Sequence, residues 1–236
     1  MSAYLAEFLG TMIMIYLGNS VVANVVLSKT KGHGAGLIVI AVGWAFAVVV
    51  PALMFGPASG AHFNSALTLA LALRGELAWT SVPLYLLMQL LGAVIGSFLV
   101  YFQYKDHFDA TADQDAKLGV FATSPAIRNF KRNFVSEVLG TFILVLAIFG
   151  ISQTTAYDAG TLGVFGVGGI IMVIGVSLGG TTGYAINPIR DLGPRIAHYL
   201  LPIRDKRDSD WSYSWIPVVA PIVGALAATG IYVGLF

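Results

Sequence analysis

Two short stretches decide the fold: Ser-Gly-Ala-His-Phe-Asn-Ser-Ala at 59–66 and Thr-Gly-Tyr-Ala-Ile-Asn-Pro-Ile at 182–189. In both, a glycine stands four positions before an asparagine, and the asparagine opens an apolar run too short to cross a bilayer. Paired short hydrophobic segments at corresponding places in two halves of a chain indicate a binding or permeation site at the membrane midplane. The sequence therefore predicts a duplicated membrane protein with a pore.

The composition also places the chain in a membrane. Hydrophobic residues make up 57% of it and charged residues 11%, more apolar surface than a soluble domain of this length can bury. Apolar runs close to or above the roughly 18 to 20 residues that span a bilayer lie at about 4–27, 36–55, 82–104, 133–152, 162–180 and 214–236. The runs 67–73 and 189–201 cover only about half of that thickness. We predict an all-α membrane protein with six transmembrane helices and two re-entrant half-helices.

The two halves repeat each other in inverted orientation. Ala-Glu-Phe-Leu-Gly-Thr at 6–11 resembles Ser-Glu-Val-Leu-Gly-Thr at 136–141, and each half carries three spans. An odd number of spans makes the second half enter from the opposite side of the membrane, so both half-helices point their N-termini inward. We expect one domain over residues 1–236, with repeat 1 at about 1–104, an external loop at about 105–130 and repeat 2 at about 131–236.

Other features exclude several kinds of partner. The net charge of +1 argues against nucleic acid. His33, His107 and His198 lack metal-ligand spacing, so we expect no metal site and no cofactor. The first span begins almost at Met1 and lacks a basic leader, so we expect it to remain in the mature chain.

The distribution of basic residues opposes the orientation expected below. With a cytoplasmic N-terminus, Arg74 would be the basic residue in a cytoplasmic connection, and the positive-inside rule alone favours the reverse orientation. The basic residues that would then lie outside are Lys29, Lys31, Lys105, Lys117, Arg128, Lys131, Arg132, Arg204, Lys206 and Arg207.

At these motifs the chain resembles the aquaporin family. Gly-Ala-His-Phe-Asn-Ser-Ala at 60–66 and Asn-Pro-Ile-Arg-Asp-Leu-Gly-Pro at 187–194 resemble the two Asn-Pro-Ala loops, and the Arg-Asp pair resembles the glycerol facilitator branch. The resemblance covers the whole chain. It implies a channel in the cell membrane, not an enzyme, that forms a homotetramer with one pore per subunit and has cytoplasmic N- and C-termini. Ser65 and Ile189 depart from the family's proline and alanine.

The asparagines offer a physical basis for a pore. A half-helix N-terminus has unpaired backbone donors and roughly half a positive charge, so two such ends at the midplane repel cations. Asn64 and Asn187 can each accept a bond from their own helix and point an amide N–H into the lumen. The loop carbonyls of 59–63 and 182–186 would supply acceptors. The alternative for a single asparagine is ordinary helix capping, but two related loops within apolar sequence favour the pore.

The resemblance also implies a selectivity filter of Trp44, Gly175, Tyr184 and Arg190. The aromatic faces would hold the carbon chain of a solute, Arg190 would bind its hydroxyls, and Gly175 would leave room where a water-selective relative has histidine. Arg190 could instead pair with Asp191, which we expect to be structural because the helix dipole favours a carboxylate there. Trp44 taken alone could be a packing residue. The Tyr184 hydroxyl either narrows the filter or adds a polar contact.

Glu7 and Glu137 are acidic residues within predicted spans, where carboxylates are usually functional. They could form a proton relay, but their matching positions favour loop support, with each accepting bonds from backbone N–H groups. His62 either packs against its loop or gates the pore in response to pH.

We therefore expect a passive channel for glycerol and other small neutral solutes, with water, in contact with membrane lipid. Dihydroxyacetone, urea and protonated lactic acid are further candidate solutes. A proton-coupled transporter and a structural protein with a closed pore are the alternatives. We also expect glycines at four-residue spacing, at 92 and 96, 175 and 179, and 230 and 234, to allow close helix packing.

Overall fold

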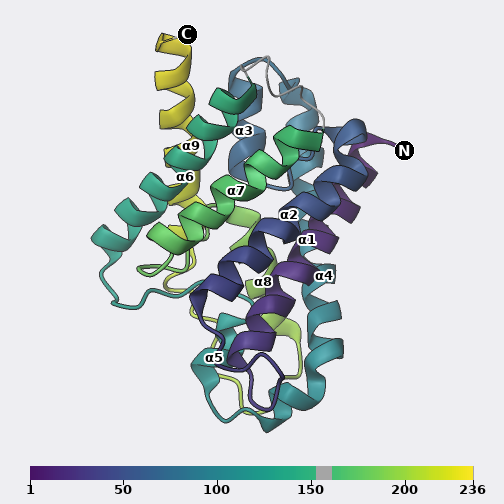
Figure 1. Ribbon diagram of the computed structural model, residues 1–236, viewed down its shortest axis with the longest axis vertical. Coiled ribbons are helices and arrows are strands. Elements are labelled where there is room, and N and C mark those ends of the chain that lie inside the picture. The colour runs from purple at the N-terminus through teal and green to yellow at the C-terminus, as the bar shows by residue number, and fades with distance from the viewer. Residues whose placement is uncertain (153–160, 236) are drawn as a thin grey trace.

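The computed structural model describes residues 1–152 and 161–235. Its helices, in chain order, are α1 (Ala3–Val26), α2 (Leu37–Ser59), α3 (Ser65–Leu73), the 3-10 turn η1 (Trp79–Ser81), α4 (Val82–Ala110), α5 (Gln114–Gly119), α6 (Phe130–Ser152), α7 (Thr161–Leu178), α8 (Pro188–Leu200) and α9 (Trp215–Leu235). Figure 1 shows them as one bundle.

The predicted spans correspond to six of these helices. Within the described residues, α1, α2, α4, α6 and α9 are long and apolar enough to cross a membrane. The sixth, α7, is apolar and shorter, and it packs on α2 and α6. The chain is therefore a multi-pass membrane protein.

The two half-helices are α3 and α8, and they interlock the repeats. Each packs against the last span of its own half and also against that of the other half: α3 contacts α4 and α9, and α8 contacts α9 and α4. The two half-helices also contact each other. Because each half completes the other, neither repeat can form the site alone.

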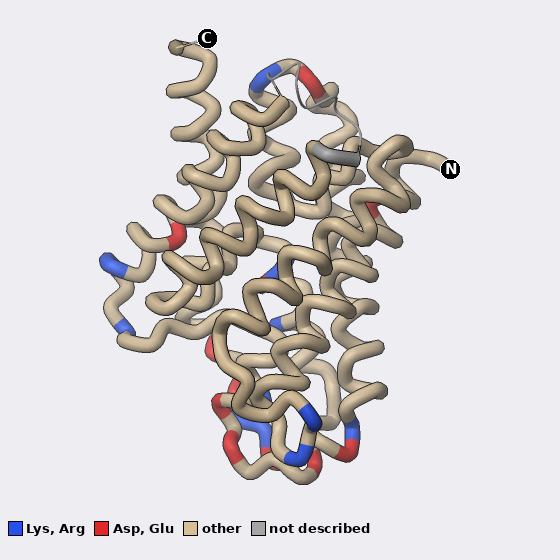
Figure 2. The backbone as a smooth tube through the Cα atoms, viewed as in Figure 1, with Lys and Arg blue, Asp and Glu red and all other residues tan. Residues whose placement is uncertain are grey.

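The inverted arrangement is visible in the course of the chain. Figure 1 shows α1 running away from the end where both termini lie, and α6 running towards it. Equivalent helices pair in both halves, α1 with α4 and α6 with α9. Figure 2 shows most charged residues at the end opposite the termini, around α5. The end opposite the termini thus carries more charged side chains, of both signs, than the end with the termini.

The segment expected as a loop at 105–130 is partly helical. Helix α4 continues past the predicted end of its span to Ala110, with a break in helical geometry at Tyr104 (φ −104°, ψ 15°). Asp113 then caps α5 by accepting bonds from the backbone N–H groups of Asp115 and Ala116. The sequence contains this cap, but apolar periodicity does not reveal so short a helix.

Glycines bring equivalent helices together in both halves. A Cβ atom on Gly92 would lie 2.4 Å from the Phe8 carbonyl oxygen of α1, and one on Gly224 would lie 2.3 Å from the Val138 carbonyl oxygen of α6. Gly96 packs on α1 in the same way. The expectation for Gly230 and Gly234 was wrong, because a Cβ atom on either would meet no atom of the described residues within 4 Å. Spacing alone does not show which glycines face another helix.

We predict that Gly92→Ala lowers the free energy of unfolding in detergent by about 1–3 kcal/mol, the usual cost of overpacking. The added methyl group has to push α4 away from the α1 backbone. Gly230→Ala is the matched control, because its methyl group enters open space. Equal stability of the two variants in thermal or chemical unfolding would contradict the assigned close packing.

Candidate functional site

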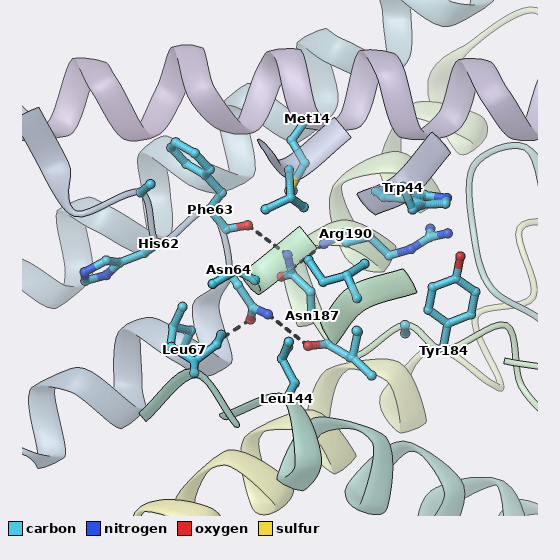
Figure 3. A pocket seen from close by; sticks show the side chains of 17 residues that line it. Met14, Trp44, His62, Phe63, Asn64, Leu67, Leu144, Tyr184, Asn187 and Arg190 are labelled. Carbon is cyan, nitrogen blue, oxygen red and sulfur yellow. Dashed lines mark hydrogen bonds between the residues drawn. The ribbon is translucent and has the colours of Figure 1, made fainter. Parts of the chain in front are cut away.

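The two asparagines lie side by side where the half-helices meet (Figure 3). Asn64 Oδ1 accepts from the backbone N–H of Ala66 at 2.9 Å, and Asn187 Oδ1 accepts from that of Ile189 at 3.1 Å. Each asparagine thus caps its own half-helix, as its residue type favours.

Each asparagine also bonds to the opposite loop. Asn64 Nδ2 donates to the Ile186 carbonyl at 2.9 Å, and Asn187 Nδ2 donates to the Phe63 carbonyl at 2.8 Å. We expected these amide groups to point into the lumen, but each donates one of its hydrogens to a protein carbonyl. An amide carries two hydrogens, so one per asparagine remains for a solute.

Both loops adopt the same unusual backbone. After Gly60 (φ 84°), Ala61 and Phe63 have φ values of 52° and 45°. After Gly183 (φ 82°), Tyr184 and Ile186 have φ values of 39° and 43°. Left-handed conformations of residues other than glycine cost on the order of 1–3 kcal/mol each and persist only where the surroundings enforce them.

Glu7 stabilises the left-handed backbone of the first loop. Its carboxylate accepts from the backbone N–H groups of His62 at 3.0 Å and Phe63 at 2.9 Å, and from Ser59 Oγ at 2.7 Å. Gln89 Nε2 of α4 adds a fourth bond at 2.7 Å. All four partners are donors, so the carboxylate acts only as an acceptor.

Glu137 holds the second loop in the equivalent way. It accepts from the backbone N–H groups of Ala185 and Ile186, both at 3.0 Å, and from Thr182 Oγ1 at 2.6 Å. These are the loop contacts expected for a supporting role. Neither Glu7 nor Glu137 lines the cavity described next.

A narrow cavity of about 70 Å³ passes the asparagines. One part of its wall is apolar and the other carries the polar loops and Arg190. It is lined by Met14, Trp44, Val48, Ala61, His62, Phe63, Asn64, Leu67, Leu144, Ile148, Val167, Ile171, Tyr184, Ala185, Ile186, Asn187 and Arg190. A wider cavity of about 470 Å³ shares His62 and Leu67 with it and extends past the C-terminal end of α3 to Glu76. The shared lining places the wider cavity directly beside the narrow one, on the side of Glu76.

Not all loop carbonyls are free for a solute. Those of Phe63 and Ile186 accept from the asparagines, and that of Ser59 accepts from the Tyr85 hydroxyl at 3.0 Å. The expected line of acceptors is therefore shorter. For the carbonyls at 60–62 and 183–185, no hydrogen-bond donor is found among the described residues.

Trp44, Tyr184 and Arg190 converge at the other end of the narrow cavity (Figure 3). Arg190 Cζ lies 4.3 Å from the centre of the Trp44 ring. Arg190 Nη1 donates to the Phe121 carbonyl at 3.3 Å. Within the described residues, the Trp44 indole nitrogen and the Tyr184 hydroxyl are buried and have no hydrogen-bond partner.

Gly175 lies behind this ring and does not line the cavity. A Cβ atom there would lie 2.9 Å from Tyr184 Cζ, and one on Gly179 would lie 2.4 Å from Tyr184 Cδ1. The space at Gly175 is therefore occupied by the Tyr184 ring, which packs against α7. Gly175 makes room for tyrosine rather than directly for a solute.

Asp191 does not pair with Arg190. It binds Arg195, with Nε 2.7 Å from Oδ1, and both side chains are completely buried. The structural role expected for Asp191 agrees with this geometry, whereas the alternative of an Arg190–Asp191 ion pair was wrong.

Two half-helices meeting at paired asparagines, with an arginine–aromatic constriction beside them, form a distinctive site, and the sequence comparison agrees with it. A family model for the major intrinsic proteins matches residues 1–232. The chain belongs to the major intrinsic protein family. Its relatives include the probable glycerol uptake facilitator protein of Thermotoga maritima, 51% identical over 236 residues that cover 100% of both chains. The glycerol uptake facilitator protein of Streptococcus pneumoniae is 51% identical over 232 residues, 98% of each chain.

A solved structure supports the same assignment. The aquaglyceroporin of Plasmodium falciparum superimposes with a TM-score of 0.85 at 32% sequence identity, over 97% of this chain and 93% of that one. The major intrinsic protein fold therefore extends over nearly the whole chain.

Sequence reasoning missed four residues that support the site, two from α4, one from the segment between α5 and α6, and one from α8 itself. Gln89 bridges Glu7 and Thr68, Tyr85 binds the first loop, and Thr123 and Arg195 bind Asp191. Arg195 could have been found, since Asp191 and Arg195 have the i,i+4 spacing of a helical ion pair. No local signal connects Gln89 or Thr123 to its partner.

We predict that Glu137→Gln lowers the thermal unfolding temperature in detergent and the solute flux. The new amide group can accept on one atom only, so one buried backbone N–H of the second loop loses its partner, at a cost of roughly 1–3 kcal/mol. The matched control for the unfolding temperature is Glu76→Gln, because Glu76 is exposed and paired with Arg74, and such surface pairs contribute about 0–1 kcal/mol. An unchanged unfolding temperature for Glu137→Gln would argue against loop support.

Proposed function

We propose that this chain is a passive channel for glycerol and other small uncharged solutes, with water, and that it excludes protons and ions. The observation that carries the proposal is the narrow path past two opposed half-helix N-termini to the constriction of Trp44, Tyr184 and Arg190. Relatives named as glycerol uptake facilitators, about half identical over the full chain, support it. The chain is a channel and not an enzyme.

The two kinds of wall explain how a polyol can pass. Apolar side chains such as Leu144 and Ile171 line one part and suit the carbon backbone. On the other part, Asn64 and Asn187 offer donors and the loop carbonyls offer acceptors, so hydroxyl groups exchange water for protein partners. The positive ends of the two half-helices repel cations. Exclusion of ions by such dipoles and an arginine is a general feature of aquaporin-type pores.

The filter favours a solute with several oxygen atoms. A buried polar group without a partner costs roughly 1–3 kcal/mol, so water or solute is expected to satisfy the Tyr184 hydroxyl and the Trp44 indole N–H. We therefore infer a polar contact from the Tyr184 hydroxyl, which the sequence left undecided. Dihydroxyacetone, urea and protonated lactic acid have the size and polarity to follow glycerol.

The geometry disfavours the two alternatives. A proton-coupled transporter would use Glu7 or Glu137, but both bind loop donors and lie outside the cavity lining. A structural protein with a closed pore has no need of a polar path, whereas here a filter and a wider vestibule join through shared residues.

The membrane setting is part of the proposal. We place the chain in the cell membrane among lipids, as a homotetramer with a pore in each subunit, and with the end that carries both termini in the cytoplasm (Figure 1). External loops tied together by ion pairs, such as Arg128–Asp210, hold basic residues without setting orientation.

The gating role of His62 remains a prediction. It lines both cavities at their junction, its Nδ1 lies 3.2 Å from Thr68 Oγ1, and its ring centre lies 5.0 Å from that of Tyr85. Protonation at this point would place a positive charge in the path.

The function is tested with proteoliposomes under a glycerol gradient, with light scattering as the readout. We expect glycerol flux that rises linearly with the gradient and is unaffected by a pH gradient. Saturable flux driven by a pH gradient would support the transporter instead, and the absence of flux would support the closed-pore protein.

We predict that Gly175→Ala lowers glycerol permeability more than water permeability. The new methyl group would meet the Tyr184 ring and Ala41 at about 3 Å, so the ring has to move into the filter. Histidine at this position should have a larger effect. Gly169→Ala is the matched control in α7, because a Cβ atom at Gly169 meets nothing within 4 Å. Equal loss of both permeabilities would refute the assigned ring.

A further inference from the structure

The filter arginine has few fixed partners. Among the described residues, the Arg190 guanidinium donates one hydrogen bond, to the Phe121 carbonyl, and stacks on Trp44. Its neighbour Asp191 turns to Arg195 instead. The direction in which Arg190 presents its remaining N–H groups to the cavity therefore depends on where the Phe121 carbonyl lies.

The segment that carries this carbonyl is fastened two residues later. The backbone N–H and Oγ1 of Thr123 both donate to Asp191 Oδ2 at 2.7 Å, and the Thr123 carbonyl accepts from Arg195 Nη2 at 3.0 Å. The Phe121 ring is also packed between Phe108 and His198, with ring centres 5.6 and 5.7 Å away. The Asp191–Arg195 pair thus holds both sides of the Thr123 backbone.

Arg195 connects this segment to the second external loop. Its Nε and Nη2 bind Asp191 at 2.7 and 3.1 Å, and Nη1 donates to the carbonyls of Ser209 at 2.7 Å and Asp210 at 3.1 Å. With the bond to Thr123, all five N–H donors of the guanidinium are used. Burial alone would raise the pKa of Asp210, but its hydrogen bond with Arg128 and the charge of that arginine lower it below its ordinary value.

The internal repeat carries this ion pair in its second half and not at the corresponding positions of its first half. By the offset of 123 residues between Asn64 and Asn187, Arg190 corresponds to Leu67, Asp191 to Thr68 and Arg195 to Ala72. The first half, which has no filter arginine, also has no charged residue at the positions that correspond to Asp191 and Arg195. A buried ion pair is weak evidence for stability, because desolvation offsets its attraction. The Asp191–Arg195 pair therefore occurs only in the half that carries the filter arginine, which links it to the filter rather than to the repeated helix arrangement.

We propose that Asp191, Arg195 and Thr123 are positioning residues for Arg190. They fix the segment 121–123 so that the Phe121 carbonyl holds the guanidinium in the orientation that binds solute hydroxyls. The proposal rests on the channel function above and adds to it a specificity determinant outside the lumen.

The test removes one oxygen atom from the network. Thr123→Val keeps the shape but loses the Oγ1 bond to Asp191, and Thr123→Ser retains that bond. We expect Thr123→Val to lower the ratio of glycerol to water permeability by about two- to tenfold, the range for one lost hydrogen bond. Thr123→Ser should stay near the original ratio. The control is Ser212→Ala, which removes a different hydroxyl bond, from Ser212 Oγ to Asp210 Oδ1. It should not change the permeability ratio.

Two results would overturn the proposal: an unchanged ratio in Thr123→Val, or a proportional fall of both permeabilities, which a purely structural role gives. Asp191→Asn should have a larger effect, and if it does not fold, Thr123→Val still decides. A second readout is independent of transport. In ¹⁵N-tryptophan spectra, the Trp44 indole signal, assigned with Trp44→Phe, should shift in Thr123→Val, because Arg190 stacks on that ring. Absence of glycerol flux with a shifted Trp44 signal would refute the channel but not the positioning.

Discussion

The structure depends on satisfying irregular backbone at the middle of a membrane, where no lipid can bond an N–H or C=O group. Both loops before the asparagines need left-handed residues, and in each a buried glutamate accepts two consecutive backbone N–H groups. The asparagines then use the carbonyl that ends the opposite loop. With the N–H groups bound on the outside, the carbonyls at 60–62 and 183–185 remain as the acceptors that a polar solute needs.

Duplication supplied a symmetric scaffold on which the two halves could differ. Ser59 and Thr182 supply equivalent hydroxyl groups to the glutamates, and Gly92 and Gly224 equivalent helix contacts. The two halves differ one turn into the half-helices, where the position of Leu67 in the first half is occupied by Arg190 in the second. A filter needs one cationic end, since a second arginine at the other end of the narrow path would add the cost of another buried charge.

Much of this arrangement could be predicted from the sequence, because the deciding signals are local or repeated. The asparagines, the glutamates and the half-helices follow from hydrophobic run lengths and matching motifs. Contacts between distant segments could not be predicted: Gln89 reaches Glu7 from α4, and Thr123 reaches Asp191 from the segment between α5 and α6. Gly224 was missed and Gly230 wrongly included because spacing does not show which helix face is covered. Gly175 was predicted to leave room for a solute, but the Tyr184 ring occupies that space.

Two arginines on one half-helix show how the same side chain can be structural or functional. Arg195 is completely buried, and each of its N–H groups has a protein acceptor. Arg190, five residues earlier, has one such bond and lines the cavity. Since burying an unmet donor costs on the order of 1–3 kcal/mol, the fold keeps Arg190 only where water or solute completes its hydrogen bonds. In the proposed filter, solute therefore binds to the N–H donors of Arg190 that have no protein acceptor, and the fully bonded Arg195 is proposed to keep those donors in place.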